Sequence, residues 1–113
     1  MRSGDQVHRP NKTTEYLSKF DSSGAAKGWR DLYATHRNTL VEAWDYLTKS
    51  PLEKSEYAYP LMTDLAITFR NWKPYERWQL KLSARSGARI WYFVSEQTVF
   101  IECVFTAHPN QTK

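Results

Sequence analysis

The chain has 113 residues, of which 41% are hydrophobic, 15% aromatic and 25% charged, and its formal net charge is +4. This length is typical of one globular domain, and the aromatic content excludes a chain that is disordered throughout. A single cysteine excludes an internal disulfide. Because the sequence has no apolar N-terminal run and no long apolar segment, we expect a cytoplasmic protein that does not associate with membranes.

The charge is unevenly distributed along the chain. Residues 1–69 are balanced, with nine basic and nine acidic side chains, whereas residues 70–113 hold seven basic and three acidic ones. A polyanionic partner is therefore expected to dock on the second part of the chain. The alternative is an ordinary solvated surface, since a modest basic excess is common on soluble proteins.

The first elements are predicted from apolar spacing. Residues 1–12 have no apolar pattern and predict a flexible tail, so the domain is expected to cover residues 13–113. A short strand is predicted over 15–20. A helix is expected to begin after the Ser22-Ser23-Gly24 cluster, where Ser or Gly caps a helix, because Trp29, Leu32, Tyr33 and His36 then recur at three- and four-residue spacing and give it one apolar face.

A second helix is predicted to begin at Thr39. The pattern Thr39-x-x-Glu42 is typical of a capping box, and Leu40, Ala43, Trp44 and Leu47 follow at helical spacing. Ser50-Pro51 ends this helix. The short connection between the two helices favours an antiparallel helical hairpin that covers a sheet. Residues 51–64 contain two prolines and no clear period, and they predict a loop.

The basic residues of the second part allow two interpretations. Five of them are spaced by four, which on a helix would form one stripe: Lys73, Arg77, Lys81, Arg85 and Arg89. However, apolar and polar residues alternate from Arg77 to Leu82, which is the period of a half-buried strand. The Ser86-Gly87 turn favours the strand. Strands are then predicted over 89–94 and 98–107, with a further short strand over 66–69.

This order predicts an α+β fold in which an N-terminal helical hairpin packs on a small antiparallel sheet. The other sheet face should stay open and carry polar residues: Arg77, Lys81, Arg89, Glu102 and His108. On the last strand, alternation assigns Val99, Ile101, Cys103 and Phe105 to the same face. Cys103 is therefore expected to be a buried, protonated and unreactive thiol.

Neither a metal ion nor a nucleotide cofactor is expected. The three histidines, His8, His36 and His108, are far apart, and the sequence has no CxxC motif and no glycine-rich phosphate loop.

The end of the last predicted strand suggests a different chemistry. His108 follows that strand, and its imidazole titrates near neutral pH, so it suits a general base or acid. Arg89 and Lys81 suit the binding of a phosphate and the stabilisation of transition-state charge. Metal-free RNA cleavage requires such a set. The alternative is that each residue is an ordinary solvated side chain and that Glu102 simply pairs with one of the cations.

Aromatic and basic residues are interleaved in the same region. Trp72, Tyr75, Trp78 and Trp91 alternate with Arg70, Lys73, Arg77 and Arg89. This composition suits stacking on unpaired bases, although aromatic residues in a small domain also form its core. Trp91 shares its predicted face with Arg89, so it is the better stacking candidate, whereas Trp78 is assigned to the inner face.

The order of elements and three short segments resemble the RelE/ParE superfamily of bacterial toxins. The segments are Glu76-Arg77-Trp78-Gln79-Leu80-Lys81, Gly87-Ala88-Arg89-Ile90-Trp91-Tyr92-Phe93-Val94 and Thr106-Ala107-His108-Pro109. The sequence looks most like the RelE-type toxins whose last strand ends in a histidine, and the similarity covers about residues 15–113.

The resemblance implies roles for these residues. Arg89 matches the phosphate-binding arginine of the family, Lys81 a strand lysine or arginine, and His108 the terminal base or acid. Arg77, Gln79, Trp91, Glu102 and Lys73 are then the expected substrate-binding residues. The implied function is a ribosome-dependent, metal-independent mRNA endoribonuclease that needs no cofactor and inhibits translation. Its implied partners are the ribosome, mRNA and a cognate antitoxin that forms a hetero-oligomer with it.

Two other functions remain open at this point. The same fold in the ParE branch implies an inhibitor of DNA gyrase, which has no catalytic residues. A basic sheet face also fits a nucleic-acid-binding module that is not an enzyme.

Overall fold

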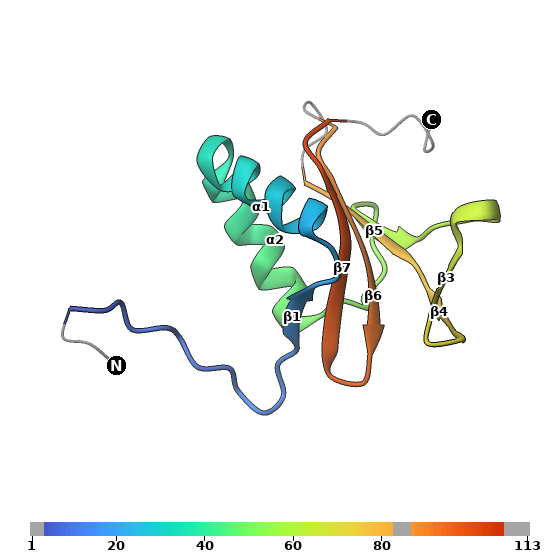
Figure 1. Cartoon of the computed structure of the whole chain (residues 1–113), viewed down its shortest axis with the longest axis horizontal. Helices are drawn as coiled ribbons and strands as arrows, with labels where there is room; N and C mark the ends of the chain where they lie inside the picture. The colour runs from blue at the N-terminus through green and yellow to red at the C-terminus, as the bar shows by residue number, and fades with distance from the viewer. Residues whose placement is uncertain (1–3, 83–86, 108–113) are drawn as a thin grey trace.

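The computed structural model describes residues 4–82 and 87–107. The protein has two α-helices, a mixed five-stranded sheet and a separate two-stranded sheet, which confirms the predicted α+β class. Figure 1 shows how these elements are arranged. The helices lie on one face of the five-stranded sheet, here called the inner face. The two-stranded sheet lies on the opposite, outer face. Within the described ranges, no helix has the length and apolar character needed to cross a membrane.

The five-stranded sheet has the order β1-β7-β6-β5-β2. Its strands are β1 (Leu17–Phe20), β2 (Ala58–Pro60), β5 (Trp78–Lys81), β6 (Arg89–Ser95) and β7 (Thr98–Phe105). The prediction of a wholly antiparallel sheet is wrong for β1, which runs parallel to β7. Because the two strands are far apart in sequence, no tight turn forces them to be antiparallel.

The two helices are α1 (Ser23–Thr35) and α2 (Arg37–Lys49), with only His36 between them. The start of α1 agrees with the prediction, because the Oγ of Ser22 accepts a hydrogen bond from the amide of Ala25 at 3.0 Å. The predicted start of α2 at Thr39 is wrong by two residues. The amide of His36 donates to the carbonyl oxygen of Leu32 in α1, and the carbonyl oxygen of His36 accepts from the amide of Leu40 in α2. No side chain caps the start of α2.

The segment predicted as a loop over residues 51–64 contains β2 and the start of a 3₁₀ turn at Thr63–Leu65. The predicted strand near residues 66–69 is observed as β3 (Ile67–Arg70), and it pairs with β4 (Lys73–Glu76), which the sequence did not indicate. The two-residue turn between them has positive φ at Asn71 and Trp72. Such turns favour Asn and Gly, so a Trp at the second position gave no turn signal.

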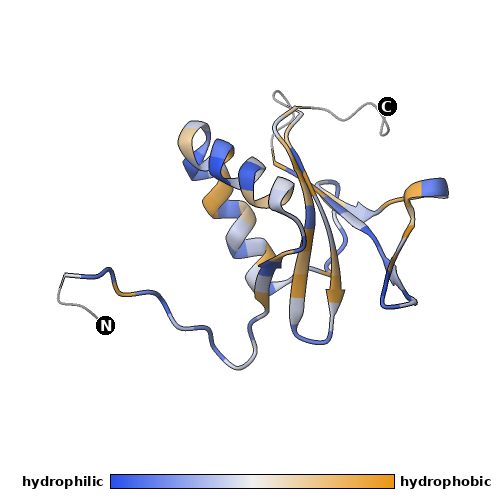
Figure 2. Ribbon diagram, viewed as in Figure 1, coloured by the Kyte–Doolittle hydropathy of each residue, from blue (hydrophilic) through white to orange (hydrophobic). Residues whose placement is uncertain are grey.

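The series β5, β6 and β7 is antiparallel as predicted, and strand alternation is the correct interpretation of the basic four-residue spacing. The inner faces of these strands form the core with the two helices. Its members are Ala25, Ala43, Leu47, Ala58, Trp78, Leu80, Ile90, Tyr92, Val99 and Ile101. Figure 2 shows hydrophobic colouring along β6 and β7, where this core lies. The predicted turn at Ser86 lies outside the described residues.

A β-bulge at Glu102 reverses the faces of the last part of β7. Tyr92 is in register with Ile101, whereas Trp91 is in register with Cys103, so Glu102 is the extra residue. As a result Val104 packs against the inner clusters, while Cys103 is opposite Trp91 on the outer face. The prediction that Cys103 shares a face with Ile101 is therefore wrong, because simple alternation does not continue through a bulge.

The helix α1 approaches β7 closely at Gly28. A Cβ atom built on Gly28 would lie 2.8 Å from the Cβ of Val104 and still closer to its carbonyl oxygen. A side chain at residue 28 would therefore force the backbone of α1 or β7 to move. The missing side chain therefore sets how closely the helix lies on the sheet.

We predict that Gly28→Ala lowers the free energy of unfolding by about 1–2 kcal/mol, because overpacking outweighs the higher helix propensity of alanine. Gly24→Ala in the same helix is the matched control, since its new Cβ would be 3.9 Å from the nearest atom, the Oγ of Ser22. This control should be neutral or stabilising by up to about 1 kcal/mol. Urea denaturation measures both, and equal effects would contradict the close approach.

The N-terminal segment is attached to the domain through Glu15. The Arg9 guanidinium donates to both carboxylate oxygens of Glu15, at 3.0 and 2.8 Å, and the amide of Lys12 donates to Oε1 at 2.7 Å. The guanidinium also lies 5.8 Å from the ring centroid of Trp44 in α2. The hydrogen bonds from Arg9 and Lys12 lower the pKa of Glu15 from its ordinary value of 4.5 to about 2.

We predict that this attachment weakens at low pH. A carboxyl whose pKa is lower in the folded state stabilises the fold above its unfolded pKa, and this contribution is lost as the pH falls from 4.5 toward about 2. Glu15→Gln should therefore have a lower Tm than the wild type at pH 7, and the difference should shrink as the pH approaches 2. Thermal melts across this pH range measure it, and a constant difference would contradict the prediction.

Candidate functional site

The outer face brings together most of the predicted site residues. Gln79 and Lys81 project from β5, Arg89 and Trp91 from β6, and Glu102 from the bulge of β7, with Arg77 preceding β5. Lys73 lies on β4 of the two-stranded sheet. His108 is outside the described residues. Catalytic and substrate-binding roles for these residues stay predictions, but their contacts separate them into two groups.

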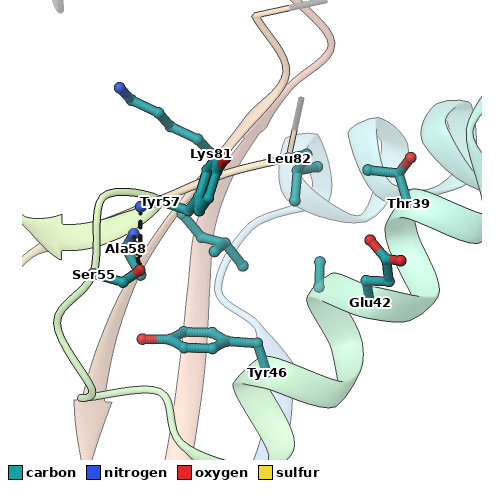
Figure 3. Close-up of a pocket in the computed structure, with 10 residues that line it drawn as sticks. Thr39, Glu42, Tyr46, Ser55, Tyr57, Ala58, Lys81 and Leu82 are labelled. Carbon is teal, nitrogen blue, oxygen red and sulfur yellow. Dashed lines mark hydrogen bonds between the residues drawn. The ribbon is translucent and has the colours of Figure 1, made fainter. Parts of the chain in front are cut away.

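A cavity of about 390 Å³ lies on the helix side of the sheet, between α2 and the β2–β5 edge (Figure 3). Tyr46 and Glu42 of α2 face Tyr57 across it, whereas the side chain of Lys81 points away. The Tyr46 hydroxyl donates to the carbonyl oxygen of Glu53 and is therefore already used. Lys81 lies at the border of this cavity, but Arg77 and Arg89 do not line it.

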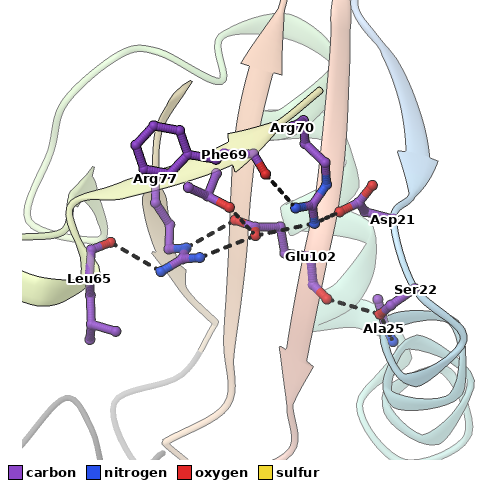
Figure 4. A network of polar contacts seen from close by, with 9 residues as sticks. Asp21, Ser22, Ala25, Leu65, Phe69, Arg70, Arg77 and Glu102 are labelled. Carbon is purple, nitrogen blue, oxygen red and sulfur yellow. Dashed lines mark hydrogen bonds and ion pairs between the residues drawn. The ribbon is translucent and has the colours of Figure 1, made fainter. Parts of the chain in front are cut away.

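The first group of residues is centred on the buried carboxylate of Glu102 (Figure 4). Arg77 donates from Nε to Oε1 at 3.0 Å and from Nη2 to Oε2 at 3.3 Å. The hydroxyl of Thr68, on β3, donates to Oε2 at 2.9 Å. The side chain of Glu102 is only 7% exposed. Arg77 and Glu102 thus neutralise each other, whereas the simpler alternative from the sequence expected Glu102 to pair with Lys81 or Arg89.

Arg70 extends this network from the two-stranded sheet to the start of α1. Its guanidinium pairs with the carboxylate of Asp21, which directly precedes the helix cap, and lies 3.6 Å from Oε2 of Glu102. It also lies 5.7 Å from the ring centroid of Phe93 on β6. Arg70 therefore connects three parts of the chain, and its charge is largely balanced by the two carboxylates.

The backbone of the bulge is satisfied by the helix cap. The carbonyl oxygen of Glu102 accepts a hydrogen bond from the Oγ of Ser22 at 3.0 Å, and the same Oγ caps α1 through Ala25. The side chain and the backbone of one bulged residue are thus used to join the sheet to both α1 and the β3–β4 hairpin. Thr68 and Arg70 as partners of Glu102, and Asp21 as the partner of Arg70, were not predicted, because these residues are far apart in sequence and carry no motif.

Trp91 and Gln79 are also hydrogen-bonded to other side chains on the outer face, apart from the Glu102 network. The indole Nε1 of Trp91 donates to Oε1 of Gln79, and Nε2 of Gln79 donates to the hydroxyl oxygen of Tyr59, each at 2.9 Å. Gln79 is 2% exposed and Trp91 is 6% exposed. The expectation that Trp91 offers an open ring for stacking is therefore not met in this structure, because Arg77 and Phe105 also lie against it.

The second group consists of Lys81 and Arg89, which differ from the other basic residues of this face. They are directly opposite each other in the register of β5 and β6. Neither forms an ion pair with any residue in ranges 4–82 and 87–107. The Nε of Arg89 is buried and has no hydrogen-bond partner among these residues. Like charges opposite each other destabilise a sheet unless an anion binds between them.

Metal binding and thiol chemistry find little support here. No group of three or more His, Cys, Asp or Glu side chains in the described part of the chain is arranged to hold a metal ion. Cys103 is partly exposed, but burial and the nearby Glu102 raise the pKa of its thiol. A raised pKa keeps the thiol protonated at neutral pH, as expected, although it lies on the outer face.

Comparison with known proteins adds no assignment, since no family model, curated protein or solved structure matches this chain.

We predict that Glu102→Gln lowers the free energy of unfolding by about 3 kcal/mol, because Arg77 then remains partly buried without a counter-charge. Thr68→Val should cost about 1–2 kcal/mol, because it removes one hydrogen bond to the carboxylate while preserving the side-chain shape. The matched control is Glu56→Gln, an exposed glutamate, for which we expect a change within about 0.5 kcal/mol. Urea denaturation of the three variants measures these values. Equal effects of Glu102→Gln and Glu56→Gln would contradict the role of this network.

Proposed function

We propose that this protein is the toxin of a type II toxin–antitoxin system, a RelE-like endoribonuclease that cleaves mRNA on the ribosome without a metal ion. The observation that carries the proposal is the Lys81–Arg89 pair. Two cations are held opposite each other on a rigid sheet, without a carboxylate partner among the described residues. Such a pair is suited to a phosphate group, which carries both negative charge and several acceptor oxygens.

The proposed roles follow from the chemistry of phosphodiester cleavage. Arg89 and Lys81 bind the scissile phosphate and stabilise the negative charge that develops on its oxygens in the transition state. The ribose 2′-oxygen attacks the phosphorus as the bond from phosphorus to the 5′-oxygen breaks. His108 accepts the 2′-hydroxyl proton or donates a proton to the leaving 5′-oxygen, and water completes the other proton transfer. In the sequence His108 follows Phe105 by three residues, and Phe105 is the register partner of Arg89. The proposal assigns proton transfer to no side chain other than His108.

The other predicted substrate-binding residues receive different roles in this proposal. Arg77, Gln79, Trp91 and Glu102 are engaged with one another or with neighbouring elements, so they support the sheet on which the cations stand. They act as positioning residues rather than as contacts to RNA. Lys73 is exposed and remains a candidate for contact with a phosphate. The proposed partners are the ribosome, mRNA and an antitoxin that forms a hetero-oligomer with the toxin in the cytoplasm.

We expect induced expression of the wild type to arrest growth and to produce mRNA cuts within codons. Arg89→Ala and His108→Ala should each reduce cleavage at least about 100-fold, the usual effect of losing a charge-stabilising group or a general acid–base. Arg30→Ala is the matched control, because Arg30 is an exposed arginine on α1, on the other side of the sheet. This control should cleave like the wild type.

The same experiment distinguishes the alternative functions. Thermal melts of each purified variant establish that it is folded before its activity is compared. Undiminished toxicity and cleavage by Arg89→Ala and His108→Ala would refute the catalytic assignment. Growth arrest with intact mRNA and with loss of supercoiling activity in a gyrase assay would instead indicate the ParE-like function. Nucleic-acid binding without toxicity would indicate a module that is not an enzyme.

A further inference from the structure

The turn of the β3–β4 hairpin presents the most exposed large hydrophobic side chain among the described residues. Trp72 is 99% exposed, and Phe69 on the adjoining strand is 64% exposed. Figure 1 shows this hairpin extending from the outer face of the five-stranded sheet, on the side away from the helices. A fully exposed Trp gains nothing from the hydrophobic core, so its presence at this position is not explained by packing.

The backbone at this turn is unfavourable for the residue that occupies it. Asn71 has φ of 52° and Trp72 has φ of 68°. Asn tolerates this left-handed region, but a bulky side chain does so only with strain, and Gly is the favoured residue at the second position of such turns. The turn therefore carries a residue that is unfavourable both for its conformation and for its exposure. Strain of this kind is concentrated at functional sites.

The hairpin is held firmly at its base, so the turn is presented in a defined position. The ring of Tyr75 stacks on Phe93 with centroids 4.8 Å apart, and Phe93 stacks on Phe100 at 5.1 Å. The contacts of Thr68 and Arg70 with Glu102 hold the other strand. These contacts involve the side of the hairpin that faces the sheet. Phe69 and Trp72 are left to the solvent.

The charges around the turn indicate the class of partner. Lys73 directly follows Trp72, is exposed, and forms no ion pair with any residue that the structure describes. The excess of positive charge in this chain also lies in residues 70–113. Exposed aromatic rings beside unpaired cations are the features by which proteins bind single-stranded nucleic acids, through base stacking and phosphate contacts.

We propose that the β3–β4 turn binds single-stranded RNA, with Trp72 stacking on an unpaired base and Lys73 contacting the adjacent phosphate. The choice of RNA over DNA rests on the proposed function, whereas the stacking site rests on the turn itself. The turn is separate from the Lys81–Arg89 pair, which belongs to a different sheet. It therefore adds affinity for the substrate strand and takes no part in cleavage.

The test is the affinity of the full chain for a short, fluorescently labelled, unstructured RNA carrying 2′-O-methyl groups, which prevent cleavage through the 2′-hydroxyl. Fluorescence anisotropy should show that Trp72→Ala weakens binding by about 5- to 150-fold, the range expected for one stacked base. Trp72→Phe should retain most of the affinity. Tyr33→Ala is the matched control, because Tyr33 is a half-exposed aromatic residue on α1 and should not affect binding.

Trp72→Gly separates the binding role from a structural one. Glycine relieves the unfavourable backbone conformation, so this variant should have a Tm at or above that of the wild type and yet bind the RNA as weakly as Trp72→Ala. A residue with a purely structural role would lower the Tm when replaced. Lys73→Ala should weaken binding and reduce the dependence of affinity on salt concentration by about one phosphate contact.

Wild-type affinity in Trp72→Ala and Trp72→Gly, or no binding of the RNA by the wild type, would overturn the proposal. If Trp72→Ala lost binding to vesicles of anionic lipid while its RNA affinity stayed at the wild-type value, the proposal would be overturned in favour of a membrane surface. The outcome is independent of the proposed nuclease. RNA binding that depends on Trp72 in a protein that cleaves no mRNA would support the turn site and refute the nuclease. Cleavage of mRNA together with RNA binding that does not depend on Trp72 would support the nuclease and refute the turn site.

Discussion

The buried carboxylate of Glu102 is the interaction on which the arrangement of this protein depends. A carboxylate with 7% exposure is stable only when its charge is balanced and its oxygens accept hydrogen bonds. Arg77 and Thr68 supply both, and the backbone of the same residue accepts from the cap of α1. The helix start, the last strand and the β3–β4 hairpin are therefore positioned by a single bulged residue.

This network divides the outer face into parts with different chemistry. In the middle, Arg77 and Glu102 neutralise each other, and Gln79 accepts from Trp91 and donates to Tyr59, so this region is closed. Lys81 and Arg89 have no such partners among the described residues, which leaves a concentrated positive charge on β5 and β6. Basic residues that are alike in sequence thus differ in charge balance, because only some of them lie within reach of a carboxylate.

Periodicity predicted much of the fold. Alternation from Trp78 to Leu82 identified β5 correctly despite the four-residue spacing of basic residues, since burial of one strand face requires a period of two. The helices were predicted from their apolar faces, and the polar face with Lys81 and Arg89 followed from the same alternation. The predictions that failed include the antiparallel orientation of β1, the face of Cys103, the loop that contains β2, the missing strand β4 and the start of α2. They depended on backbone geometry or on pairing between distant segments.

The sequence by itself determined the α+β class, the antiparallel series of three strands and the face that carries the basic residues, because these follow from local patterns of apolar side chains. Only the tertiary structure decided which cations are neutralised and which aromatic rings are exposed. Glu102 meets Arg77, Thr68 and Arg70 only after distant segments come together, and its bulge cannot be read from alternation. For the same reason the buried ring is Trp91 and the exposed ring is Trp72, although both occur in similar basic and aromatic surroundings in the sequence.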